Sequence, residues 1–149
     1  MATTYDFTAG STIVGVKVPI IPTPTENSLF VLRNIIDCSK QTLSASATDV
    51  AQVLDVPAGT TVMAVYTRTI TAETASATFT LGYGGSAALW GTGLAADTAA
   101  GAILGATHDW VPLHFASADT IDIVLSGAVD FDAFKFEVVA ICLKALDTY

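Results

Sequence analysis

The chain has 149 residues, of which 52% are hydrophobic and only 13% are charged, about half the usual charged fraction of about 25%. Fourteen acids against six bases give a formal net charge of −8, which repels nucleic-acid phosphates and anionic lipid headgroups. We therefore expect one folded core, no nucleic-acid partner and no membrane partner. So weakly charged a surface is expected to be covered in part by something other than water.

The first 28 residues differ from the rest. An apolar run at 12–18 is followed by three prolines between Pro19 and Pro24, which exclude a helix. We expect an extended N-terminal arm that reaches a neighbouring subunit or, alternatively, an edge strand followed by a turn. Residues 29–149 are expected to form one β-sandwich domain. The candidates for a subunit contact in the first segment are Ile13, Val14, Val16, Val18, Ile20 and Ile21.

Alternating side chains predict strands through most of the chain. The strand that begins at Leu29 is apolar on both faces and is expected to be covered on both sides, with Leu29, Val31 and Ile35 on one face and Phe30, Leu32, Ile36 and Cys38 on the other. Small polar residues at 39–49 predict a surface loop. The further strands expected are Val50–Val56, Thr61–Thr71, Ala77–Tyr83, Trp110–Phe115, Thr120–Ser126 and Ala133–Leu146.

Two of these segments carry specific expectations. In the strand 61–71, one face is predicted to hold Val62, Ala64, Tyr66 and Ile70. The segment 86–107 is rich in Ala and Gly and shows no clear period, so a short helix or a long loop is expected there.

The last strand has two unlike faces. One face is apolar throughout and is expected to point into the core: Phe134, Phe136, Val138, Ala140 and Cys142. The other face begins with charged residues and ends apolar, which indicates that half of it is covered by another layer or subunit. The candidates for that subunit contact are Val139, Ile141 and Leu143.

The pattern sums to an all-β, single-domain β-sandwich of about eight strands. Alternation alone leaves open whether the sandwich is a jelly roll or immunoglobulin-like, because it does not show the order of strands in a sheet.

Catalytic equipment is not recognisable in the sequence. There is no GxSxG motif, and the two histidines, His108 and His114, are interpreted as structural. Cys38 and Cys142 show no zinc spacing and are expected to be buried free thiols. The late acids are interpreted as turn residues, with loop-bound calcium as a less favoured alternative. We expect no enzyme, no cofactor and no metal site.

Aromatic residues support one alternative function. Tyr83 and Trp90 could stack on a sugar, which would make the chain a carbohydrate- or receptor-binding module. That alternative requires one of these rings to be exposed.

Three turn-and-strand phrases resemble the small β-sandwich decoration, or cement, proteins of tailed-bacteriophage capsids. They are Val53–Thr60, Ala77–Gly85 and Ala118–Gly127. The resemblance implies a jelly-roll-like fold that assembles as a trimer on the outside of a head shell. It further implies that the partners are further copies of the chain and the major capsid protein. On the same resemblance, the carbohydrate- or receptor-binding alternative would be a module of a phage fibre or tail. The protein would be made in the host cytoplasm, which agrees with the lack of a secretory signal in the first ten residues, and would then reside on the virion surface.

Overall fold

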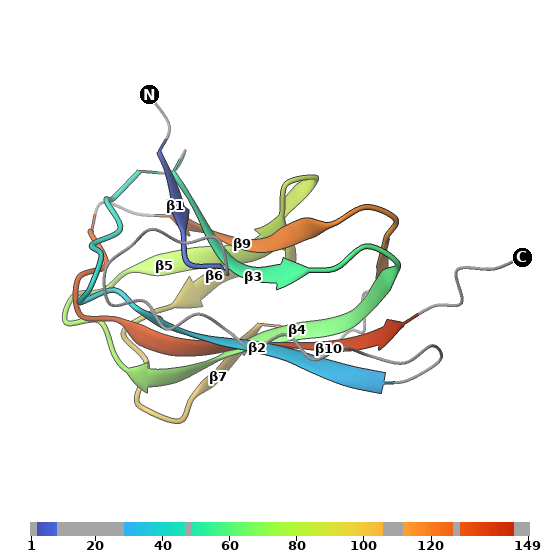
Figure 1. Ribbon diagram of the computed structural model, residues 1–149. Helices are drawn as coiled ribbons and strands as arrows, with labels where there is room; N and C mark the ends of the chain where they lie inside the picture. The colour runs from blue at the N-terminus through green and yellow to red at the C-terminus, as the bar shows by residue number, and fades with distance from the viewer. Residues whose placement is uncertain (1–2, 9–28, 47–48, 106–111, 127–128, 145–149) are drawn as a thin grey trace, which may run out of the picture.

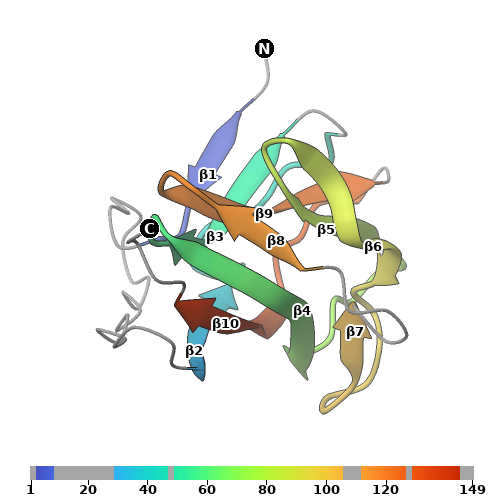
Figure 2. The same cartoon turned by 90° about the vertical axis from the view of Figure 1, so that its right-hand side faces the viewer.

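The computed structural model describes residues 3–8, 29–46, 49–105, 112–126 and 129–144. These residues contain strands and turns without a helix, and therefore no helix that could span a membrane. The described residues form ten strands, which are labelled in Figures 1 and 2: β1 (Thr4–Asp6), β2 (Leu29–Asp37), β3 (Val50–Val56), β4 (Thr60–Thr71), β5 (Thr78–Tyr83), β6 (Ser86–Ala95), β7 (Ile103–Gly105), β8 (Leu113–Phe115), β9 (Asp119–Ser126) and β10 (Lys135–Lys144).

The strands form two sheets that face each other (Figures 1 and 2). Sheet I has the order β1-β3-β9-β5-β6, and sheet II has the order β2-β10-β4-β7, with β8 also paired to β4. Apart from the parallel pair β1–β3, all pairs are antiparallel. The pairs β2 with β10, β3 with β9, β4 with β8 and β7, and β5 with β6 are nested in chain order, and the pairs β10 with β4 and β5 with β9 join them into sheets. This nesting is a hairpin rolled into two sheets, the topology of a jelly roll. The expected sandwich is confirmed, with ten strands instead of about eight.

The core lies between the sheets and is built from their inward-facing apolar side chains. The five residues predicted for the inner face of the last strand are all fully buried. Phe134 and Phe136 stack with ring centroids 4.6 Å apart, and Phe79 and Phe131 complete the aromatic cluster. Contacts of this kind add about 0.5–1.5 kcal/mol each to the burial of the rings.

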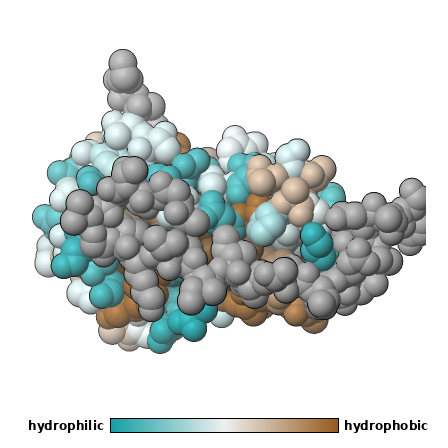
Figure 3. Space-filling view, in the orientation of Figure 1, coloured by the Kyte–Doolittle hydropathy of each residue, from teal (hydrophilic) through white to brown (hydrophobic). Residues whose placement is uncertain are grey.

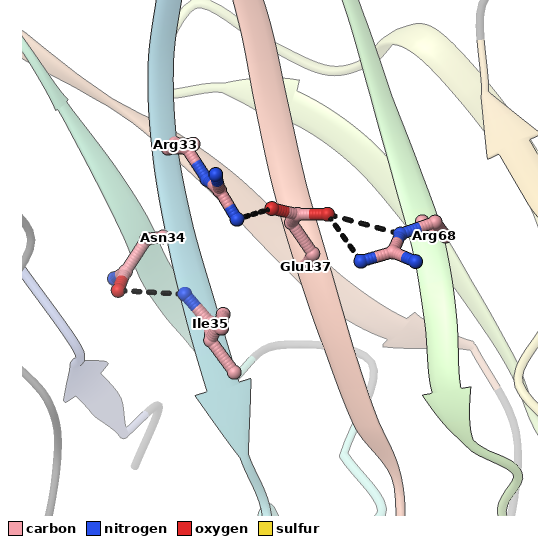
Figure 4. A network of polar contacts seen from close by, with 5 residues as sticks. All are labelled: Arg33, Asn34, Ile35, Arg68 and Glu137. Atoms are coloured by element: carbon pink, nitrogen blue, oxygen red, sulfur yellow. Dashed lines mark hydrogen bonds and ion pairs between the residues drawn. The ribbon is translucent and has the colours of Figure 1, made fainter. Parts of the chain in front are cut away.

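One polar side chain inside the sandwich joins the two sheets. Asn34 on β2 is buried, and its Nδ2 donates to the carbonyls of Phe7, 2.8 Å away, and Val53, 2.9 Å away. Its Oδ1 accepts the backbone N–H of Ile35 (Figure 4). Because all of its polar atoms have partners, burying this amide costs little.

The prediction for residues 86–107 was wrong. The segment holds two strands, β6 and β7, and no helix. Two irregular registers interrupt the pairing of β5 with β6, which explains why no regular period was visible. At the turn, the chain folds back so closely that a Cβ on Gly82 would lie 2.1 Å from the carbonyl oxygen of Ser86. Only glycine allows that approach.

The prediction that Val62, Ala64, Tyr66 and Ile70 share one face was wrong for Val62. Ala64 pairs with Ile141, whereas Val62 pairs with Cys142, so Met63 is an extra residue in β4. A β-bulge of this kind reverses the alternation beyond it. Val62 therefore points into the core, and Ala64 and Tyr66 lie on the outer face of sheet II.

The loop at 39–49 was predicted to lie on the surface, but one of its side chains, Leu43, is fully buried. The backbone of Leu43 pairs with that of Phe131 through two hydrogen bonds of 2.9 Å.

The buried carboxylate of Glu73 accepts the N–H groups of residues 132–134 at 3.0–3.1 Å and that of Thr74 at 2.8 Å. Burial raises the pKa of Glu73, but these donors outweigh it and lower the pKa below its ordinary value.

Within the first 28 residues, the structure describes only 3–8, where β1 forms an edge strand of sheet I. The candidate arm residues Ile13, Val14, Val16, Val18, Ile20 and Ile21 lie outside the described residues, so the arm stays a prediction. The same holds for His108 and Trp110.

Candidate functional site

The outer face of sheet II carries the residues that the sequence proposed for a subunit contact. Register places Leu143 beside Leu29, Ile141 beside Val31, and Val139 beside Arg33. On the other side of β10, Ile141 pairs with Ala64 and Val139 with Tyr66. We call this surface the sheet II outer face, and it comprises Leu29, Val31, Arg33, Ile35, Ala64, Tyr66, Arg68, Glu137, Val139, Ile141 and Leu143.

One end of the sheet II outer face is apolar and open. Leu29 is 72% exposed and Val31 is also exposed, while Ile141 and Leu143 are half-buried and Val139 is buried. Hydrophobic side chains appear along the lower edge of the molecule, where sheet II lies (Figure 3). The expectation that β2 is covered on both faces is therefore wrong for the chain by itself, because only its inner face is buried. Contiguous exposed apolar side chains are typical of an interaction surface.

The centre of the sheet II outer face holds three charged side chains in one row across β2, β10 and β4 (Figure 4). Glu137 is paired with Arg33 through one carboxylate oxygen, and its other oxygen accepts Nη2 of Arg68 at 2.9 Å and Nε at 3.0 Å. The Glu137 side chain is only 8% exposed, whereas Arg33 is 62% and Arg68 is 47% exposed. The triad carries one net positive charge, and its guanidinium groups face outward with unused N–H donors.

The outer face of sheet I differs in composition. Register places Asp6 beside Gln52 and Gln52 beside Asp122, and Asp55 beside Thr120. Asp122 is only 7% exposed. Burial, together with the nearby charge of Asp119, raises its pKa to about 6, although the Thr120 hydroxyl at 2.7 Å acts in the opposite direction.

The aromatic residues of the sugar-binding alternative do not present open faces. Trp90 is 3% exposed and lies in strand β6. Tyr83 is half-buried, with its ring centroid 6.1 Å from Trp90 and 5.6 Å from Phe115. Both rings contribute to the hydrophobic core, and the exposed ring that this alternative requires is missing.

The described residues offer little for catalysis. His114 is exposed on β8, and its Nδ1 lies 3.1 Å from the Thr61 hydroxyl. Cys38 and Cys142 are buried free thiols, also as predicted, and burial raises the pKa of each. Across the described ranges, no group of three or more His, Cys, Asp or Glu side chains is placed to hold a metal ion.

Sequence reasoning missed the contribution of Arg33 and Arg68 to the candidate contact surface. Arg33 and Arg68 are 35 positions apart in the sequence and lie 104 and 69 positions before Glu137. They meet at Glu137 because β10 lies between β2 and β4. A signal was present, since each is the only cation of its own strand. Without the strand order, however, nothing aligned them in one row.

The fold defines the class of the protein as a double-sheet jelly roll, an architecture used by viral capsid and lectin domains. The sequence matches no protein-family model and no curated protein. Among solved structures, the chain is similar to a chain described as "Cyanophage Pam1 capsid asymmetric unit", with a TM-score of 0.55 and 14% sequence identity. The match covers 90% of this chain and 98% of that chain. This likeness shows a shared fold.

Proposed function

We propose that the chain is a structural protein of a bacteriophage virion and acts as a capsid decoration protein. The observation that carries this proposal is the shared jelly roll, which extends over almost the whole of this chain and of the cyanophage capsid chain. The open apolar end of the sheet II outer face and the low charged fraction support a role in assembly.

In this role the protein acts by binding, without turnover. Copies associate with one another, as a trimer, and with the major capsid protein on the outside of the shell. Burial of Leu29, Val31, Ile141 and Leu143 would supply about 25 cal/mol per Å² of apolar area removed from water. A ligand that binds only the assembled shell stabilises the shell by mass action.

The test uses virions purified from the host that carries the gene. Gold-labelled antibodies against the chain are expected to mark the head, and mild denaturant is expected to strip the chain while the shell stays closed. Stripped heads should break down at a lower temperature, and adding back purified protein should reverse the change. Labelling of the tail fibres instead of the head would contradict the proposal and support the receptor-binding alternative.

A further inference from the structure

The charged residues of the described strands are segregated between the two sheets. The strands of sheet II carry Arg33, Arg68, Lys135 and Lys144 against Asp37 and Glu137. The strands of sheet I carry four acids and neither Lys nor Arg: Asp6, Asp55, Asp119 and Asp122. The sandwich therefore has one basic side and one acidic side, although the whole chain is acidic.

This segregation disfavours a contact between two identical faces. A two-fold contact through the sheet II outer face would bring Arg33 and Arg68 of one copy against the same residues of the other. Like charges that meet across a contact cost several kcal/mol, whereas opposite charges fix partner and register. The acidic side of a further copy is the surface that suits the exposed guanidinium groups.

The outer face of sheet I is open toward β1 and β3, where Asp6, Gln52 and Asp55 are half-buried. Toward β5 the same face is covered by the chain itself, because a Cβ on Gly82 would lie 2.1 Å from the carbonyl oxygen of Ser86 and the Thr80 hydroxyl is buried. The part of this face that can receive a second copy is therefore its acidic β1–β3 side.

We infer that the sheet II outer face of one copy docks on the outer face of sheet I of the next copy, with Arg33 and Arg68 facing Asp6 and Asp55. Leu29 and Val31 are covered by the same contact. This inference deepens the proposed function, on whose self-association it rests. A contact between two different faces repeats from copy to copy and forms a closed ring when the rotation permits. A closed ring of three copies would be the trimer expected from the proposed function.

The experiment measures self-association of the purified chain by sedimentation and light scattering over a concentration series. Arg33→Glu on sheet II and Asp55→Arg on sheet I are each expected to weaken association at least about tenfold. The association constant of the double variant is expected to lie within about threefold of that of the parent, because each contact again joins opposite charges. A higher salt concentration should weaken self-association of the parent chain, because salt screens the charges.

A matched variant distinguishes loss of self-association from loss of folding. Arg33→Glu stands beside Glu137 and could unfold the sheet, so Val31→Glu probes the same face without touching the ion pairs, and circular dichroism confirms the fold of each variant. Loss of association with Val31→Glu but not with Asp55→Arg would overturn the inference in favour of a two-fold contact. A parent that stays monomeric throughout would also overturn it. Neither result alters head labelling, so the proposed function stands or falls separately.

Discussion

The outer faces of the two sheets each carry a buried carboxylate, and the two carboxylates have unlike partners. Glu137 on sheet II lies between Arg33 and Arg68, whereas Asp122 on sheet I accepts one hydroxyl hydrogen bond and its sheet has no cation in its strands. Burial raises the pKa of Asp122 to about 6. The two acids are therefore expected to contribute differently to stability, because cationic and N–H partners offset the cost of burying a carboxylate.

Among the carboxylates, the largest expected effect is at Glu73, whose partners are backbone N–H groups. Glu73→Ala leaves three N–H groups at residues 132–134 without their acceptor, and we expect it to lower the free energy of unfolding by about 3 kcal/mol. Glu73→Gln keeps one acceptor oxygen and should cost about half as much. Urea unfolding at pH 7 measures both. A loss below about 1 kcal/mol for the alanine variant would show that other acceptors replace the carboxylate.

The next effect concerns the three charged residues Arg33, Glu137 and Arg68 on the outer face of sheet II. Arg68→Ala removes two hydrogen bonds to Glu137 and leaves that buried acid with Arg33 alone. Because the guanidinium is half-exposed, we expect a loss of about 1–2 kcal/mol, between the values for surface and buried pairs. Lys40→Ala, in an exposed turn, is the matched control and should change stability by less than about 0.5 kcal/mol. Equal losses of unfolding free energy in the two variants would mean that the ion pair of Arg68 with Glu137 does not contribute to stability.

On sheet I the expected effect has the opposite sign. The folded state holds the Asp122 proton more tightly than the unfolded state, so stability falls as pH rises from the ordinary pKa of 3.8 to about 6. Asp122→Asn removes this dependence and should stabilise the protein by about 1 kcal/mol at pH 8, by about half as much at pH 5 and by little at about pH 3.5. Thr120→Val removes the hydroxyl that lowers this pKa and should move the transition to higher pH. A difference between Asn variant and parent that does not vary with pH would contradict this account.

The smallest expected effect on stability falls on the open end of the sheet II outer face. Leu29 is 72% exposed, so Leu29→Ser should change the free energy of unfolding of dilute protein by less than about 0.5 kcal/mol. The same variant should weaken self-association, as light scattering at high concentration would show. Its counterpart on the inner face, Leu32→Ser, should cost several kcal/mol. A large cost for Leu29→Ser in dilute protein would show that this side chain is already covered.

Much of the fold could be predicted because each local signal agreed with the tertiary structure. The strand Val50–Val56 was predicted at its observed bounds, and the inner face of β10 was predicted residue by residue. Prediction failed where the alternation breaks: the bulge at Met63 reversed the faces of β4, and the irregular β5–β6 pairing hid β6. Val139, Ile141 and Leu143 share one face of β10, as predicted, and their role as a subunit contact stays a prediction. Arg33, Arg68 and Leu29 lie beside them only through pairing of distant segments.

By itself, the sequence determined the all-β class, the buried side of each regular strand, the free thiols and the shortage of surface charge, because these depend on composition and on the period-2 alternation of a strand. Only the tertiary structure decided that the hairpin is rolled into a jelly roll, that three charges align across sheet II, and that acids and bases separate onto opposite sides. Those features depend on which strands are neighbours, and strand neighbours are set by contacts between residues far apart in the chain.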